Sequence, residues 1–177
     1  MARTEVRIAG FGGQGVVLAG VLLGQAALND GRYAVQTQSY GAETRGGAAR
    51  SEVIVSDEPV VYPEVIAPGV MAVLSQAALD RYLSDLAPDA TLIVDADLVT
   101  DVPETGAQLY RGRFTEVAGQ ELGRPIVANM VMLGFLVAAT GVVSGGGLRE
   151  AVRAGVPAGT EALNLKALTR GMEMREG

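Results

Sequence analysis

The 177-residue chain contains no cysteine, no histidine and no tryptophan. Without Cys or His it cannot form a disulfide, hold an iron–sulfur cluster through thiolates, build an ordinary zinc site or use a Ser-His or Cys-His nucleophile. The polar groups left for chemistry are carboxylates, hydroxyls, arginines, the backbone and one lysine, Lys166.

Aromatic residues and positive charge are also scarce. Only 5% of the residues are aromatic, the formal net charge is −6 and the isoelectric point is about 4.7. Nucleic-acid binding needs a basic patch and stacking platforms, so this composition predicts no nucleic-acid partner. Hydrophobic residues make up 49% of the chain, enough to bury a core in a single domain spanning residues 1–177.

Long apolar runs are missing as well. The longest, residues 130–143, has 14 residues, whereas a membrane span needs about 18 or more. The amino-terminal sequence MARTEVRIAG lacks the apolar core of a signal peptide. The sequence therefore predicts a cytoplasmic protein with no membrane partner.

Apolar runs and helical periodicity alternate along the chain. They predict strands at residues 6–9, 33–39, 51–56, 70–74, 91–97 and near 108–110, and helices at 15–29, 76–83, 126–139, 148–154 and 162–174. The triplet of glycines at 145–147 is expected to form a flexible joint before the helix at 148–154. This alternation predicts an α/β fold, a three-layer α/β/α domain with a mostly parallel, Rossmann-like sheet. No helix is predicted between the strands at 33–39 and 51–56, which allows either one antiparallel strand or an irregular crossover and leaves the strand order open.

A glycine loop follows the first predicted strand and opens the first predicted helix. Its sequence GFGGQG satisfies the G-x-G-x-x-G pattern through Gly10, Gly12 and Gly15, with Gly13 and Gln14 between them. The free N–H groups and the positive end of the helix favour an anionic ligand such as a pyrophosphate, and Gln14 adds a side-chain donor. The alternative is that the glycines only allow the helix and the strand to pack closely.

The end of the second predicted strand argues against classical NAD binding. An acidic residue that holds the ribose is expected there, about 20 residues after the glycine loop. Residues 36–39 are instead Gln-Thr-Gln-Ser.

The segment YGAETRGGAAR follows the second predicted strand, at the edge of the sheet where the glycine loop also emerges. Arg45, followed by Gly46 and Gly47, is placed to bind a phosphate or a carboxylate, with Glu43 as its orienting partner. Equally, these residues could form a self-contained loop that stiffens a protein interface.

Three blocks in order, GFGGQG, SYGAETRGGAARSEVIVSDEPV and ANMVMLG, resemble the gamma subunit of the 2-oxoacid:ferredoxin oxidoreductases over nearly the whole chain. The resemblance implies one subunit of a larger enzyme that oxidatively decarboxylates a 2-oxo acid to an acyl-CoA and passes electrons to ferredoxin. It implies alpha and beta partner subunits, in some cases a ferredoxin-like delta subunit, with thiamine diphosphate and 4Fe-4S clusters held by those partners. This chain would contribute to coenzyme A handling and to assembly, holding no cofactor alone and supplying no catalytic residue and no metal ligand.

Carried over by position, the resemblance implies a set of binding residues facing the shared active region. The set is Gly10, Gly12, Gly13, Gln14, Gly15, Ser39, Tyr40, Gly41, Glu43, Arg45, Gly46, Gly47 and Asn129. Ala42 departs from the family pattern, which often has proline there, so the loop is expected to be more mobile. Asn129 is expected at the start of the long helix, as a cap or a partner contact.

Three other features have simpler interpretations. Asp95 and Asp97 could form a metal or acid–base site, but a solvated strand end with a helix or turn cap is favoured, because further ligands are missing nearby. Lys166 is expected to face water, and Met130 and Met132 to fill the core. The alternatives to an oxidoreductase subunit are a stand-alone module that binds FAD, NAD or a mononucleotide, and a scaffold without a ligand.

Overall fold

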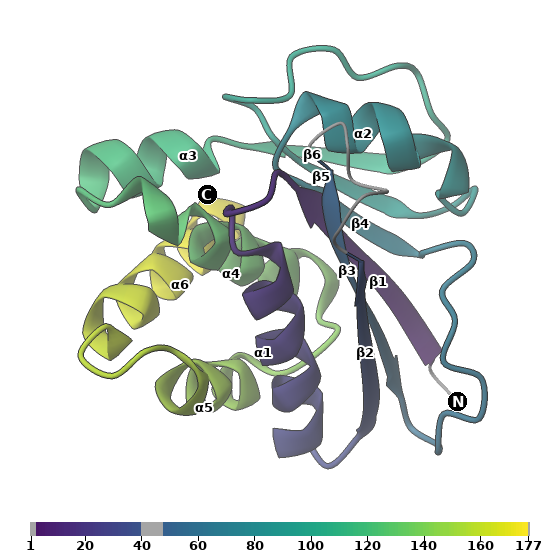
Figure 1. The fold of residues 1–177 in the computed structure, drawn as a ribbon, viewed down its shortest axis with the longest axis horizontal. Coiled ribbons are helices and arrows are strands. Elements are labelled where there is room, and N and C mark those ends of the chain that lie inside the picture. Colours follow the sequence, from purple (N-terminus) through teal and green to yellow (C-terminus); the bar gives the residue numbers. More distant parts are fainter. Residues whose placement is uncertain (1–2, 40–47, 177) are drawn as a thin grey trace.

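The computed structural model describes residues 3–39 and 48–176 of the chain. Its six strands form a single sheet in the order β2-β3-β1-β4-β5-β6 (Figure 1). The strands are β1 (Arg3–Gly10), β2 (Tyr33–Ser39), β3 (Ala49–Ser56), β4 (Val70–Val73), β5 (Thr91–Asp95) and β6 (Gln108–Gly112).

The longer helices are α1 (Val16–Asn29), α2 (Gln76–Tyr82), α4 (Ala128–Thr140), α5 (Gly145–Gly155) and α6 (Glu161–Glu176). Short helical segments are η2 (Leu83–Asp85), α3 (Phe114–Glu116), η3 (Val117–Glu121) and η4 (Pro125–Val127). Within the described residues, no helix is both long and apolar enough to cross a bilayer. The longer helices lie within a few residues of their predicted bounds, whereas the turns at 114–121 were not predicted from the sequence.

The sheet is mixed, and β3 is its antiparallel strand. β3 pairs antiparallel with β1 on one side and with β2 on the other, whereas β1, β4, β5 and β6 are parallel to one another. Residues 40–48 are too few to return the chain parallel to β2, because parallel neighbours need a crossover of about a dozen residues or more. The prediction of an α/β fold with a mostly parallel sheet and one antiparallel strand is confirmed.

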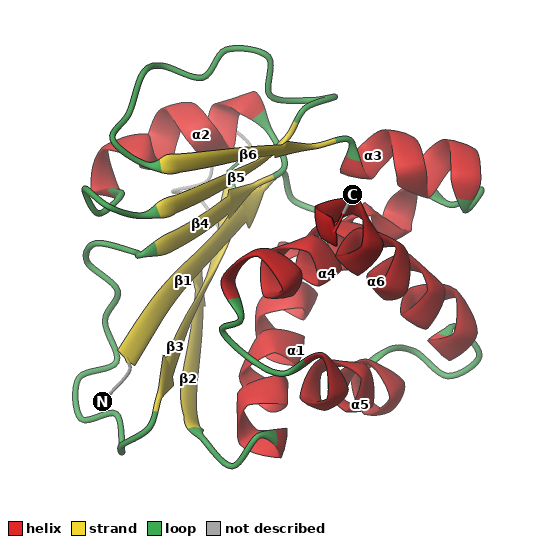
Figure 2. Cartoon of the chain, turned by 180° about the vertical axis from the view of Figure 1, so that it is seen from behind, coloured by secondary structure: helices red, strands yellow, loops and turns green. Residues whose placement is uncertain are grey.

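Helices cover both faces of the sheet, but one face carries more helices than the other. In Figure 2, α1, α4, α5 and α6 lie on one side of the sheet and α2 lies on the other. The larger core forms between the sheet and α1, α4 and α5, and includes Leu23, Met130 and Met132. The smaller core lies under α2 and includes Met71 and Leu79. Met130 and Met132 are fully buried, as predicted from the sequence.

The helices α4 and α6 cross at two glycines. A Cβ at Gly134 would lie 2.1 Å from the carbonyl oxygen of Leu168, and one at Gly171 would lie 1.9 Å from that of Val131. Neither position has room for a side chain, so the close approach of these backbones requires glycine.

The glycine triplet at 145–147 forms the first turn of α5, so the prediction of a flexible joint there is wrong. The Ser144 hydroxyl accepts a hydrogen bond from the Gly147 N–H at 2.9 Å and donates one to Asp30, at the end of α1, at 2.5 Å. A Cβ at Gly147 would lie 2.4 Å from the Asp30 carboxylate. The glycines therefore allow α5 to pack on the end of α1, and an N-terminal cap compensates for their low helix propensity.

Candidate functional site

The carboxyl ends of β1 and β2 lie at the same edge of the sheet. The two strands are parallel because β3 lies between them and is antiparallel to both. At this edge Gly10 pairs with Ala49, and Ser39 pairs with Arg50. The glycine loop (residues 10–15) leaves β1 here, and Ser39 and Ala48, which flank the second loop, also lie here.

Most of the second loop lies outside the described residues. The binding residues expected there are Tyr40, Gly41, Glu43, Arg45, Gly46 and Gly47, and their contacts stay a prediction. Ala42, for which the sequence predicts greater mobility, lies outside the described residues as well.

The side chain of Gln14 holds the glycine loop in place through two hydrogen bonds. Its side-chain oxygen accepts a hydrogen bond from the Phe11 N–H at 2.5 Å, and its Nε2 donates to the carbonyl of Leu74, just beyond β4, at 2.9 Å. A Cβ at Gly10 would lie 2.5 Å from the Gln14 Oε1, so this position has no room for a side chain. The side-chain amide of Gln14 therefore fixes the loop to the end of β4. The sequence instead predicted that this amide would face a ligand.

The amino end of α1 carries unpaired backbone donors. The N–H groups of Gly12, Gly13 and Gly15 have no acceptor among the described residues. Gly15, at the N-cap, has φ of 72° and supplies no side-chain cap, and the first turn of α1 contains no acidic residue. The positive end of the helix is therefore uncompensated within the described chain, as an anion site requires.

Asn129 holds the other side of the glycine loop. Its Nδ2 donates to the Gly15 carbonyl at 3.2 Å, and its Oδ1 accepts from the Met130 N–H at 2.9 Å. A Cβ at Gly15 would lie 2.3 Å from Nδ2, and Asn129 itself is only 4% exposed. Asn129 therefore positions the loop through α4; the N-cap of that helix is Val127.

Two apolar hollows flank the loop. The first, of about 290 Å³, is lined by Gly13, Gln14, Leu74, Leu98, Thr115, Pro125, Ile126 and Ala128. The second, of about 250 Å³, is lined by Phe11, Gly12, Gly13, Gly15, Val16, Val17 and Ala49. At their rims, Ile126 is 65% and Phe11 45% exposed. The edge thus combines backbone donors for an anion with apolar surface.

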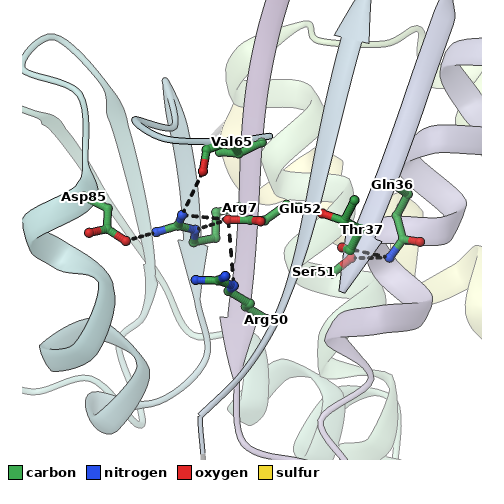
Figure 3. Close-up of polar contacts among 8 residues, drawn as sticks. All are labelled: Arg7, Gln36, Thr37, Arg50, Ser51, Glu52, Val65 and Asp85. Carbon is green, nitrogen blue, oxygen red and sulfur yellow. Dashed lines mark hydrogen bonds and ion pairs between the residues drawn. The ribbon is translucent and has the colours of Figure 1, made fainter. Parts of the chain in front are cut away.

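A buried ion-pair network lies on the α2 face of β1 and β3 (Figure 3). Arg7, 2% exposed, donates through Nε to Glu52 at 2.8 Å and forms a second ion pair with Asp85. Arg50 approaches Glu52 only to 3.9 Å and keeps a side chain that is 34% exposed. The two arginines balance the two carboxylates in charge, and the network brings the guanidinium group of Arg50 to the same edge of the sheet as the glycine loop.

The guanidinium groups of Arg7, Arg50 and Arg81 all lie 5.3–5.5 Å from the ring centroid of Tyr82. Arg50 is not among the binding residues expected from the sequence. Its pairing with Ala9 across β1 and β3 is the signal that places it at this edge, and that pairing requires the strand order.

Asp95 and Asp97 are used as caps for the turn that starts at α3. Asp95 is fully buried and accepts from the Thr115 N–H at 3.1 Å and from the Asp97 N–H at 3.0 Å. Asp97 accepts from the Glu116 N–H at 2.8 Å. The predicted cap is confirmed, but Asp95 is buried and not solvated as expected, and burial raises the pKa of its carboxyl group.

A larger hollow, about 520 Å³, lies away from this edge, between η3 and α6. It is lined by Glu121, Leu122, Leu165, Lys166, Thr169, Arg170 and Glu173. Lys166 is exposed there, as predicted. Arg170 pairs with Glu121 at 2.7 Å and lowers the pKa of that carboxyl group.

Comparison with known proteins gives consistent matches. The model of the pyruvate ferredoxin/flavodoxin oxidoreductase family matches residues 5–174. The 2-oxoglutarate synthase subunit KorC of Methanocaldococcus jannaschii is 50% identical over 175 residues, which cover 97% of this chain and 94% of the relative.

A solved structure, the gamma subunit of a keto/oxoacid ferredoxin oxidoreductase from Geobacter sulfurreducens, has a TM-score of 0.89 and 44% identity, and each chain covers 98% of the other. The ketoisovalerate oxidoreductase subunit VorA of Methanothermobacter thermautotrophicus is 37% identical over 76% of this chain, but the match covers only 28% of VorA.

Proposed function

Because the chain belongs to the pyruvate ferredoxin/flavodoxin oxidoreductase family, we propose that its glycine-loop edge binds coenzyme A in a complex that oxidises 2-oxoglutarate. The chain is a gamma subunit of a 2-oxoacid:ferredoxin oxidoreductase and works within a multisubunit complex. The choice of 2-oxoglutarate is supported by the difference in identity between the KorC relative, 50%, and the VorA relative, 37%.

The observation that carries the coenzyme A proposal is the set of unpaired N–H groups at Gly12, Gly13 and Gly15 beside an uncompensated helix end. A diphosphate offers several acceptor oxygens and negative charge, which is the chemistry that such a helix end recognises. Arg50 adds a cation at the same edge.

The apolar hollow between Gly13 and Ile126 suits the other end of the same ligand. The pantetheine arm of coenzyme A is a chain of methylene and amide groups, and a hollow of about 290 Å³ with a mostly apolar lining can shield it from water. An anion seat and an apolar hollow side by side match coenzyme A better than they match a free phosphate.

Thiamine diphosphate and the iron–sulfur clusters are assigned to partner subunits in this proposal. The chain has no cysteine to ligate iron. Among the described residues, no group of three His, Cys, Asp or Glu side chains is arranged to hold a metal ion, which the diphosphate of thiamine diphosphate requires. Asp95 and Asp97 already accept backbone hydrogen bonds as caps.

A stand-alone dinucleotide-binding module is not favoured. In the classical dinucleotide fold the second strand is the neighbour of the first and presents the ribose-binding acid beside the glycine loop. Here β3 separates β1 from β2, and β2 ends in Gln-Thr-Gln-Ser. Family membership likewise places the chain among subunits of larger enzymes.

Gly12 offers a direct test, because a Cβ at this position has no neighbour within 4 Å and its backbone has no positive φ. Gly12→Asp places a negative charge in the anion seat, and Gly12→Asn is the neutral control of the same size. Like charges brought together cost several kcal/mol, so we expect Gly12→Asp to weaken coenzyme A binding by about tenfold or more. Gly12→Asn should lose much less.

The measurement is isothermal titration calorimetry of coenzyme A with the assembled complex, together with turnover on 2-oxoglutarate, pyruvate and 2-oxoisovalerate. Equal affinity of the wild-type and Gly12→Asp complexes would overturn the binding site. Preferred turnover of pyruvate or 2-oxoisovalerate would overturn the substrate. Ferredoxin reduction by the isolated chain would overturn the assignment of the other cofactors to partners.

A further inference from the structure

The connection between β3 and β4, residues 57–69, carries the two most exposed large apolar side chains of the described residues, Val61 and Ile66, and a third exposed one, Tyr62. Val61 is 93% exposed, Ile66 69% and Tyr62 59%. Figure 1 shows this connection passing around the amino end of β1, at the opposite end of that strand from the glycine loop. Three large apolar residues within six positions form a patch of the kind that marks an interaction site.

The connection is held firmly to the sheet. Arg3 donates through Nη2 to the carbonyls of Tyr62 and Glu64, at 3.2 and 3.5 Å. Arg7 donates to the carbonyl of Val65 at 3.4 Å, as Figure 3 shows. Val65 itself is buried. The chain therefore turns one apolar residue inward and leaves its neighbours outward.

Two further features fix this conformation. Arg7 is itself anchored by the buried ion pairs with Glu52 and Asp85. The connection also contains three prolines, Pro59, Pro63 and Pro68, and each restricts a backbone angle. An ordered segment loses little conformational entropy when it binds, so this apolar patch is preorganised for a partner.

We infer that residues 57–69 form the docking surface for a different subunit of the same oxidoreductase, one that presents an apolar cleft with basic residues at its rim. Glu58 and Glu64 flank the apolar side chains and form no ion pair within the described residues. Tyr62 donates to Glu64 at 2.5 Å, which keeps that carboxylate beside the patch. A basic rim on the partner would complement both carboxylates.

A second copy of this chain fits the patch poorly. A symmetric dimer would place Glu58 and Glu64 near their own copies, in a chain whose net charge is already −6. The VorA relative supports a different chain instead, because its match to this domain covers only 28% of a longer oxidoreductase polypeptide. There the domain is joined to other parts of the enzyme.

The test uses Val61→Asp combined with Ile66→Asp, which adds charge to two exposed positions. Leu28→Asp is the control for a charge added to an exposed apolar position, because Leu28 is 52% exposed on α1, outside the connection. Each chain is titrated against the remaining subunits of the complex in biolayer interferometry. We expect the double variant to bind at least about tenfold more weakly, because charged groups are depleted at interface cores, and Leu28→Asp to bind as wild type.

A neutral double variant, Val61→Ser with Ile66→Ser, separates lost apolar contact from added charge and should also weaken binding. Circular dichroism checks that each variant is folded. Wild-type affinity of both folded double variants would overturn the inference. A wild-type chain that dimerises on its own, and whose dimer the Asp double variant dissociates, would also overturn it in favour of a second copy. Coenzyme A binding by the assembled wild-type complex is measured in parallel, and its failure would count only against the glycine-loop proposal.

Discussion

Replacing Gln14 by alanine should destabilise the chain and weaken ligand binding together. The substitution removes two hydrogen bonds, one accepted from the Phe11 N–H at 2.5 Å and one donated to the Leu74 carbonyl at 2.9 Å. At about 1 kcal/mol for each bond, the loss is about 2 kcal/mol. For a domain of this size that corresponds to a fall in Tm of roughly 4–8 °C.

The same two bonds hold the glycine loop in the shape that leaves its N–H groups unpaired. Gln14→Glu keeps an oxygen acceptor for the Phe11 N–H, but it removes the donor to Leu74 and brings a carboxylate to the anion seat. Coenzyme A affinity should therefore fall in the order wild type, Gln14→Ala, Gln14→Glu. Differential scanning fluorimetry gives the Tm values, and calorimetry gives the affinities. If Gln14→Ala keeps both the wild-type Tm and the wild-type affinity, Gln14 does not brace this loop.

Three further predictions concern the scaffold. Arg7→Met removes the cation nearest to the buried Glu52 and should lower the free energy of unfolding by about 3–5 kcal/mol. Adding Glu52→Leu should restore at least half of that loss, as measured by urea unfolding. Burial raises the pKa of Asp95 above its ordinary 3.8, so its stabilising contribution is present below that value and is lost as the pH rises through the folded-state pKa. The urea midpoint of the wild type should accordingly fall relative to that of Asp95→Asn as the pH rises above 3.8. Gly171→Ala drives a Cβ into a carbonyl of α4 and should cost about 2 kcal/mol or more. Gly24→Ala, which meets only ordinary contacts at 3.9 Å, should be neutral or stabilising in the same thermal melt.

Local signals predicted the elements of this fold well. The strand Tyr33–Ser39 has the predicted boundaries, and the lack of a predicted helix after it allowed for the antiparallel strand that the structure shows. The glycine triplet at 145–147 shows the limit of such signals. Ser144, directly before the triplet, caps the first turn of α5, and its hydroxyl donates to Asp30, which is 114 residues away in the sequence. The glycines alone predict a joint, whereas the cap and its distant partner make them a helix start.

In the candidate site, too, some features were predictable from local sequence and others depend on distant contacts. The glycine loop was recognisable because its pattern is local and follows a strand directly. The residues that hold it are remote: Gln14 bonds to a carbonyl 60 positions away, and Asn129 bonds to one 114 positions away. Arg50 reaches the edge only because β3 runs antiparallel beside β1. The sequence did not predict the strand order, so it could not predict this position of Arg50. Sequence patterns located the ligand-binding edge, and tertiary contacts decide which side chains are left to meet a ligand.

The two proposed surfaces lie at opposite ends of β1. The seven residue steps from Arg3 to Gly10 span roughly 23 Å at the rise of a strand. A subunit docked on residues 57–69 would therefore leave the glycine loop open to a ligand arriving at the other end. Substitutions separated by more than about 10 Å, without shared partners, usually have additive effects. Arg7 is the exception, because it bonds to the Val65 carbonyl and also to Glu52, two residues from Arg50. Loss of the Arg7 guanidinium should therefore disturb both the docking surface at residues 57–69 and the glycine-loop edge. A substitution within one of these surfaces should disturb that surface alone.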